Sequence, residues 1–182
     1  YDLKTLLINS AVSSLLSWYI LAQLYYWHLL ICKYYRAMLF IGPHVSISGY
    51  VANALDRAKE LGATGFAIFT KNQRQWKSPE LKEEDIVLFK DKMNSYGYSN
   101  SCILPHAGYL INLATPDEEL RIKSLNLFLE EARRITSLGL DIINIHPGSY
   151  KEGSIEDGIK RSAMMIDEVL SQFPNIKIAI EN

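Results

Sequence analysis

Five short apolar runs recur along the chain after residue 38, and none of them alternates regularly with polar residues. They cover residues 39–45, 65–70, 101–104, 141–146 and 177–181. A short apolar run without alternation is typical of a strand that is buried on both faces. The pattern therefore predicts five buried strands.

Between these runs, apolar residues return every three or four positions, which is typical of helices with one buried face. Four such stripes are present: Val51, Ala54, Leu55, Ala58 and Leu61; Ile86, Phe89, Met93 and Tyr96; Leu125, Phe128, Ala132 and Ile135; and Ile155, Ile159, Ala163, Ile166 and Leu170. We expect each stripe to face the sheet.

Short polar sequences mark where these helices begin and end. Ser78-Pro79 and Thr115-Pro116 each predict an N-cap followed by a proline in the first turn, and Glu118 predicts a capping box with Thr115. Glycines suited to a left-handed backbone follow three of the stripes: Gly62, Gly97 and Gly139.

The strict alternation of strands and helices predicts a mainly parallel sheet with right-handed crossovers. Two architectures of the α/β class fit this order, namely a doubly wound sheet and a (β/α)8 TIM-type barrel. Neither of the common glycine-rich phosphate-binding motifs occurs in the chain, so a nucleotide-binding sheet loses its usual support. Periodicity alone does not choose between the two architectures.

The first 37 residues differ in composition from the rest. No Asp, Glu, Lys or Arg occurs from Thr5 to Cys32, and this stretch is long enough to span a bilayer. Lys33 and Arg36 follow it, as the positive-inside tendency would require. The alternative is that the segment before Met38 is not native. We therefore divide the chain into a hydrophobic extension, residues 1–37, and a barrel part, residues 38–182, with membrane attachment only if residues 5–32 are native.

Charge and cysteine content exclude some classes of protein. The 19 basic and 20 acidic side chains give a net charge of -1, so any contact with a nucleic acid must come from a local surface. Cys32 and Cys102 are the only cysteines, which argues against a disulfide scaffold or a thiolate zinc finger. A reducing, cytoplasmic location fits this composition.

Four residues with metal-binding side chains lie at or just past the ends of predicted strands: His44, His106, His146 and Glu181. In a parallel barrel these strand ends converge on one mouth. Imidazole nitrogens and carboxylate oxygens are ligands that zinc accepts, and three of them leave the open position of a catalytic site. Each histidine alone could also be a hydrogen-bonding residue of a turn. Together, His106, His146 and Glu181 predict a metal site, and His44 could orient a ligand or water beside it.

Two predicted loops at the same mouth carry groups that suit DNA. The loop after the second strand offers phosphate donors in Lys71 and Arg74 and amides in Asn72 and Gln73. The loop after the third strand contains Tyr109 and Leu110, which could wedge into a base stack. The first loop could equally be a solvated loop, and the second could equally cover the core.

The motifs together resemble the endonuclease IV family. GPHVSISGY, FTKNQRQW, ILPHAGYLINLA, INIHPGS and IAIEN occur in the order of that family and cover nearly all of residues 38–182. The resemblance implies the N-terminal part of a (β/α)8 barrel, stopping after about five β/α units. It also implies a DNA-repair enzyme in which a zinc-activated hydroxide hydrolyses the phosphodiester 5′ to an abasic site.

The same resemblance assigns roles to individual residues. It makes His106 and His146 ligands of one zinc ion and Glu181 a catalytic carboxylate that bridges to a second. It implies that Arg74, Tyr109 and Leu110 enter the duplex. The partner would be double-stranded DNA with abasic sites, and no obligate protein partner is implied.

The family sequence continues beyond the position of Asn182, where its other metal ligands lie. We therefore expect at most part of the three-zinc cluster in this chain, and no activity from the chain alone. Two other interpretations stay open, namely a metal-dependent sugar isomerase or epimerase of the same barrel type, and an inactive truncated product.

Overall fold

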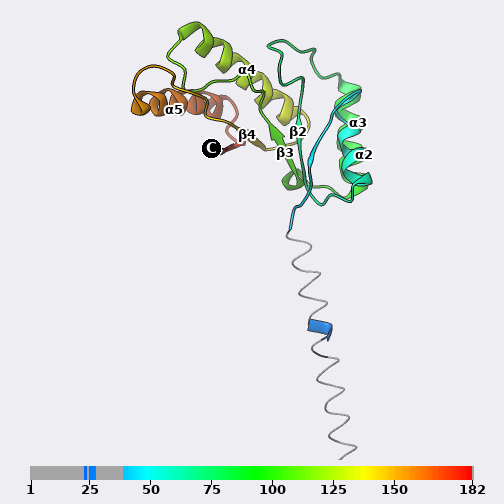
Figure 1. The fold of residues 1–182 in the computed structure, drawn as a ribbon. Helices are drawn as coiled ribbons and strands as arrows, with labels where there is room; N and C mark the ends of the chain where they lie inside the picture. The colour runs from blue at the N-terminus through cyan, green and yellow to red at the C-terminus, as the bar shows by residue number, and fades with distance from the viewer. Residues whose placement is uncertain (1–22, 24, 28–38, 182) are drawn as a thin grey trace, which may run out of the picture. The chain divides into compact units, whose positions relative to one another are not determined.

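A parallel five-stranded sheet organises the chain (Figure 1). The computed structural model describes residues 23, 25–27 and 39–181. The strands are β1 (His44–Val45), β2 (Phe66–Phe69), β3 (Ile103–His106), β4 (Ile142–Ile145) and β5 (Lys177–Ile180). The helices between them are α2 (Asn53–Glu60), α3 (Glu83–Tyr96), α4 (Glu118–Ser137) and α5 (Ile155–Gln172), with a 3₁₀ turn at Asn100–Cys102.

The order of the strands in the sheet distinguishes between the two predicted architectures. Each strand pairs in parallel with the next one along the chain, in the order β1-β2-β3-β4-β5. A doubly wound sheet reverses its strand order at a switch point, whereas a barrel does not. The described strands therefore form an arc of a (β/α) barrel.

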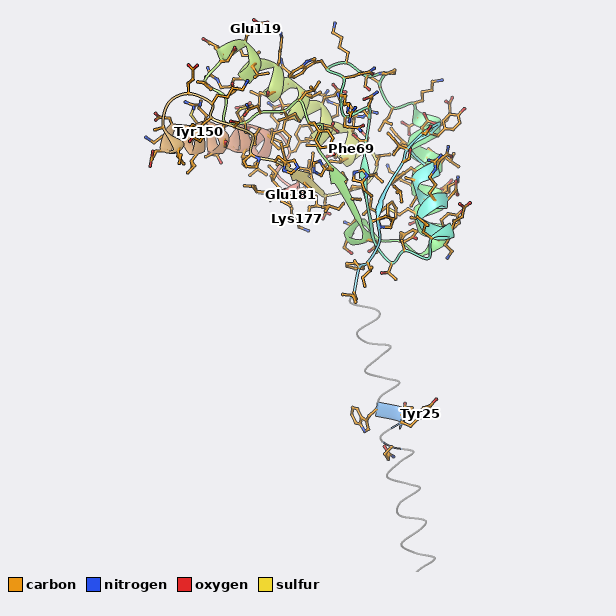
Figure 2. All side chains as sticks on the ribbon, in the orientation of Figure 1. Tyr25, Phe69, Glu119, Tyr150, Lys177 and Glu181 are labelled. Atoms are coloured by element: carbon orange, nitrogen blue, oxygen red, sulfur yellow. The ribbon has the colours of Figure 1, made fainter. Side chains whose placement is uncertain are left out.

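One face of the sheet packs against the helices, and the other face lines the inside of the barrel arc. Ile68, Ile103 and Ile143 are almost completely buried, on the face that packs against the helices. On the other face, which is the inner face of the barrel arc, Ala67 lies beside Leu104. Lys177 begins β5 on this inner face, and Glu181 follows the last residue of the strand (Figure 2).

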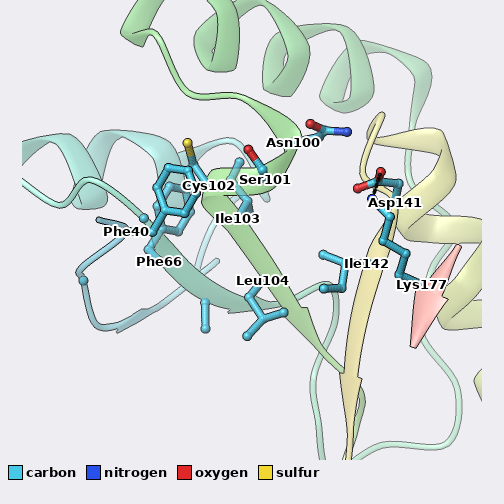
Figure 3. A pocket seen from close by; sticks show the side chains of 13 residues that line it. Phe40, Phe66, Asn100, Ser101, Cys102, Ile103, Leu104, Asp141, Ile142 and Lys177 are labelled. Carbon is cyan, nitrogen blue, oxygen red and sulfur yellow. Dashed lines mark hydrogen bonds and ion pairs between the residues drawn. The ribbon is translucent and has the colours of Figure 1, made fainter. Parts of the chain in front are cut away.

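A cavity of about 410 Å³ lies along the inner face at the amino ends of β2 to β5 (Figure 3). Its lining includes Phe40, Leu104 and Ile142, and an ion pair between Lys177 and Asp141 (Nζ to Oδ2, 3.0 Å) lies beside them. The histidines at the carboxyl ends of the strands do not line it. The cavity is therefore part of the barrel interior and is separate from the predicted metal site.

The predicted bounds of the first and third strands were wrong. Leu39 and Ile41 are more than half exposed, and only His44 and Val45 of the first run form a strand. Pro43 has no amide hydrogen to donate to a ladder. Before it, the Thr64 and Gly65 amides donate to the carbonyl oxygen of Ile41, and the Ile41 amide donates to the Thr64 hydroxyl.

The third strand begins at Ile103, two residues later than predicted, and extends to His106. Before it, the Ser99 hydroxyl lies 2.7 Å from the Ser101 hydroxyl and 3.2 Å from the Cys102 sulfur within the 3₁₀ turn. Such local side-chain bonds compete with strand pairing. At the other end, His106 is the last residue of the strand, whereas the predicted strand ended before it.

The predicted apolar stripe of α5 was wrong in its first half, whereas Ile166 is partly buried and packs against the core. The buried residues of the helix are Gly158, Ser162, Met165 and Val169, while Ile155 and Ile159 are 56% and 64% exposed. Gly158 lies so close to Tyr150 that an added Cβ would come within 2.7 Å of the tyrosine Cβ. The small residues therefore let the helix approach its neighbours, and Ile155 and Ile159 face outward. Leu61, just after α2, is likewise exposed, although the other residues of its predicted stripe are buried.

The predicted first residues of two helices were wrong, whereas the glycines predicted to follow three helices are confirmed. Asp117 caps α4 by accepting a hydrogen bond from the Leu120 amide (2.9 Å), so Thr115 and Glu118 form no capping box. Helix α3 begins after Lys82, well beyond Ser78. The glycines that end helices have positive φ: Gly62, Gly97 and Gly139.

The predicted extension, residues 1–37, lies largely outside the described residues, and its boundary stays a prediction. Within the described part of the chain, no helix is long and apolar enough to cross a membrane.

Candidate metal centre and nucleic-acid interface

The three predicted metal ligands converge at the carboxyl ends of neighbouring strands. His106 ends β3, His146 follows β4 and Glu181 follows β5. One ligand atom from each side chain lies within 4.8 Å of the others. The His106 Nε2 atom is 3.4 Å from Oε2 of Glu181, and the two imidazole centroids are 5.1 Å apart.

Strand register explains why these side chains share one face. Asn144 pairs with His106 on one side and with Ala179 on the other. Side chains two residues apart in a strand point to the same face. His146 and Glu181 therefore lie on the inner face, one step beyond Asn144 and Ala179.

Backbone carbonyl groups orient both imidazole rings. Nδ1 of His106 lies 2.7 Å from the Ala107 carbonyl oxygen, and Nδ1 of His146 lies 3.1 Å from the Glu181 carbonyl oxygen. Because a carbonyl oxygen only accepts, each Nδ1 must donate, so that in the neutral form of the ring Nε2 carries the lone pair. Metal-binding histidines in proteins have this arrangement.

Asn144 fixes the carboxylate of Glu181. The Asn144 side chain is 9% exposed, and its amide donates a hydrogen bond to Oε2 of Glu181. This bond is the main reason that the pKa of Glu181 is lowered, with smaller contributions from His146 and His106. Sequence reasoning missed Asn144, although a polar residue inside the apolar run IINI is the signal that could have found it.

The donor set of this site fits zinc. Two imidazole nitrogens and one carboxylate oxygen are the ligands of a catalytic zinc site, which keeps one further position open. Within the described residues, no other group of three such side chains was found.

Aromatic rings surround the histidines. Phe69, the last residue of β2, lies 4.4 Å from His44, 5.3 Å from His106 and 5.3 Å from Tyr109 between ring centroids. Desolvation and, to a lesser extent, His106 lower the pKa of His44, which favours its neutral form. The structure thus places His44 beside the predicted ligands, with a ring separation of 6.4 Å from His106, and outside the group of three.

In the loop after β2, the position of Lys71 does not agree with its predicted role as a phosphate contact. The Lys71 side chain is 1% exposed, and its ammonium group pairs with Oε1 of Glu130 at 2.9 Å. A buried ammonium held in an ion pair is not presented to a phosphate group, so the geometry does not support Lys71 as a DNA contact. Asn72 and Arg74 are exposed, and Gln73 is partly buried.

Tyr109 and Leu110 differ in their exposure. Tyr109 is 56% exposed, whereas Leu110 is partly buried and packs against the core. The Tyr109 amide donates to the Gln73 carbonyl oxygen (3.1 Å), which joins the two loops. A cavity of about 580 Å³ opens beside them, lined by His44, Phe69 and Gln73 among others.

A second pair of loops is joined by Asn112. Its side chain donates to the Ser149 carbonyl oxygen (2.9 Å) and accepts from the Ser149 amide (3.0 Å). Gly148 packs against it so closely that an added Cβ would lie 2.1 Å from Oδ1 of Asn112. The residues that follow β3 and β4 are therefore held together next to His146.

Comparison with known proteins agrees with this geometry. Residues 55–182 match the family model described as xylose isomerase-like TIM barrel. The chain is 46% identical over 146 residues to the protein described as "Probable endonuclease 4" of Campylobacter concisus (strain 13826), covering 80% of this chain and 52% of that protein.

Solved structures show the same likeness. Endonuclease IV from Thermus thermophilus matches with a TM-score of 0.67 and 26% identity, over 79% of this chain and 52% of that one. A D-tagatose 3-epimerase-like protein matches with a TM-score of 0.58 and 16% identity, over 78% and 53% of the two chains, which shows a shared fold alone. The chain spans about half the length of these relatives. It belongs to the xylose isomerase-like TIM barrel family, and within that family it is similar to endonuclease IV.

Proposed function

We propose that this chain forms part of a zinc-dependent endonuclease that hydrolyses the phosphodiester 5′ to an abasic site in duplex DNA. The observation that carries the proposal is the convergence of His106, His146 and Glu181, whose ligand atoms lie within 4.8 Å of one another at the carboxyl ends of three neighbouring strands. The identity of 46% to a protein described as an endonuclease supports the same reaction class.

The chain's own residues would prepare this site for zinc. His106 and His146 present Nε2 because their Nδ1 atoms donate to carbonyl groups, and Asn144 keeps the Glu181 carboxylate in place. Zinc bound there supplies Lewis-acid chemistry, which polarises phosphoryl oxygens and lowers the pKa of water. Glu181, as a bridging carboxylate, would connect this ion to a second one.

Loops at the mouth would bind the DNA. Arg74 is exposed and would neutralise a phosphate, Asn72 and Gln73 would contact sugar or base edges, and Tyr109 would enter the base stack. Leu110 would support Tyr109 from its partly buried position. An abasic site costs less to unstack than an intact one, which would make it the preferred target.

The epimerase alternative rests on fold alone. The epimerase-like structure is 16% identical to this chain, and such a likeness does not extend to a substrate. The exposed Arg74 and the 56% exposed Tyr109 suit a duplex better than an enclosed sugar.

Metal binding by the full chain is the first test. Competition with a zinc-binding dye should show zinc binding that His146→Ala and Glu181→Gln weaken strongly, because each removes one ligand. Glu152→Gln is the matched control, since Glu152 is exposed and outside the group of three ligands. Equal zinc affinity in all four proteins would refute the site.

DNA binding is the second test. Fluorescence anisotropy should show tighter binding to a duplex with a tetrahydrofuran abasic analogue than to the same duplex without a lesion. We expect the chain alone to leave the abasic duplex uncut, because its described residues bring together three ligands, fewer than a three-zinc cluster needs. Identical affinity for both duplexes would contradict abasic-site recognition.

A further inference from the structure

A buried polar cluster beneath the loop after β2 has no part in the function proposed above. It consists of Thr70 and Lys71, which follow β2, and of Glu130, Glu131 and Arg134 on α4. Thr70 and Glu131 are each 1% exposed. Burial of a carboxyl group and its partners is costly, so this cluster needs an explanation.

The cluster holds the loop at both ends. The Thr70 hydroxyl donates to Oε2 of Glu131 at 2.5 Å, and Nη2 of Arg134 donates to the Thr70 carbonyl oxygen at 2.8 Å. Nη1 of the same guanidinium donates to the Pro79 carbonyl oxygen, also at 2.8 Å. One arginine thus bridges residues 70 and 79, which enclose the exposed Arg74.

The same cluster lies under the loop after β3. A Cβ added at the buried Gly108 would lie 3.6 Å from Oε1 of Glu131 and 3.4 Å from the Gln73 carbonyl oxygen. The next residue, Tyr109, donates its amide to that same Gln73 oxygen. Helix α4 therefore supports both loops that carry the predicted DNA contacts.

We propose that Thr70, Glu131 and Arg134 are positioning residues for DNA binding. They hold the loop of residues 70–79 in the conformation that presents Arg74 to a phosphate and supports Tyr109 at the base stack. This inference rests on the function proposed above. Side chains that bind a ligand need such support, because small displacements of the loop weaken several contacts at once.

Substitutions at Thr70 test the proposal in the full chain. Thr70→Val keeps the shape of the side chain and removes the hydroxyl, whereas Thr70→Ser keeps the hydroxyl. Thr136→Val is the matched control, because the Thr136 hydroxyl donates within α4, to the Ala132 carbonyl oxygen, and is exposed. Four quantities are measured: zinc affinity, affinity for the abasic duplex, the salt dependence of that affinity, and amide hydrogen exchange over residues 71–79.

The expected result distinguishes a positioning role of Thr70 from a general role in folding. Thr70→Val should bind the abasic duplex roughly tenfold more weakly, since the buried hydrogen bond between Thr70 and the Glu131 carboxyl group is lost. The slope of log affinity against log salt should fall by about 1 as the phosphate contact of Arg74 is lost. Exchange over residues 71–79 should become faster, zinc affinity should stay the same, and Thr70→Ser should restore all of these properties.

Four other results would count against the positioning role or against the proposed function. Unchanged exchange in Thr70→Val overturns the positioning role. Faster exchange with unchanged DNA affinity, or a parallel loss of zinc and DNA affinity that Thr70→Ser does not restore, overturns it as well. If the unaltered chain does not distinguish the abasic duplex, the proposed function fails instead, and the exchange data still show whether the cluster holds the loop.

Discussion

The side-chain amide of Asn144 donates a hydrogen bond to the carboxylate of Glu181, which follows the neighbouring strand. Asn144 is therefore placed to orient the proposed metal ligand Glu181 from within the sheet. The hydrogen bond from Asn144 is also the largest cause of the lowered pKa of Glu181, and it favours the charged carboxylate.

Replacing Asn144 should weaken zinc binding while leaving the ligands in place. We expect Asn144→Leu to reduce zinc affinity about 10- to 100-fold, the usual cost of losing a residue that holds a metal ligand. Competition with a chromophoric chelator measures the affinity. Asn126→Leu serves as control, because Asn126 is exposed on α4. Equal affinities in the two variants would show that Glu181 needs no support.

Tyr109 should matter more to DNA than to metal. Tyr109 is 56% exposed, and its ring centroid lies 5.9 Å from that of His106. Loss of one stacking contact costs about 1–3 kcal/mol, so Tyr109→Ala should weaken binding of the abasic duplex roughly tenfold. Zinc affinity should change much less. Leu61→Ala, which removes an exposed apolar side chain just after α2, should change neither quantity. Equal losses of zinc and DNA binding in Tyr109→Ala would indicate a folding defect.

The pairing of Asp56 should make stability depend on pH. Hydrogen bonds from Lys92 and then Tyr96 lower the pKa of Asp56 below its ordinary value of 3.8. A carboxyl group whose pKa falls on folding stabilises the folded state above its unfolded pKa, and this contribution is lost as pH falls through the folded pKa. Asp56→Asn should therefore lower the free energy of unfolding at pH 7, and the deficit should shrink below about pH 4.

Urea unfolding at several pH values measures this effect. Asp91→Asn removes an exposed carboxylate of α3 and is the matched control. A deficit for Asp56→Asn that stays constant from neutral to acidic pH would contradict the linkage.

Close packing at Gly148 should forbid a side chain there. Gly148 has a φ of 84°, and an added Cβ would overlap the Asn112 side chain. Gly153 has a φ of 99° but open space around its Cα. Both alanine variants carry backbone strain of order 1–3 kcal/mol, and Gly148→Ala carries the overlap in addition. Thermal or urea unfolding should rank Gly148→Ala as clearly less stable than Gly153→Ala, and equal stabilities would mean that Asn112 moves aside freely.

Several features of this protein were determined by local sequence patterns. The alternation of apolar runs and amphipathic stripes predicted five parallel strands with four helices, because strand and helix periodicities are properties of the local backbone. The positions of His106, His146 and Glu181 at strand ends predicted that they would meet, since parallel strands bring their carboxyl ends to one edge of the sheet. The structure agrees on both points.

Other features were decided by tertiary contacts. Helix α5 buries Gly158 and Ser162 in place of Ile155 and Ile159, because close packing against Tyr150 selects the smaller face. Lys71 pairs with Glu130 from a helix almost sixty residues away, although its neighbours in sequence suggested a DNA contact. Burial and pairing depend on groups that only the folded chain brings together, and periodicity along the sequence does not contain that information.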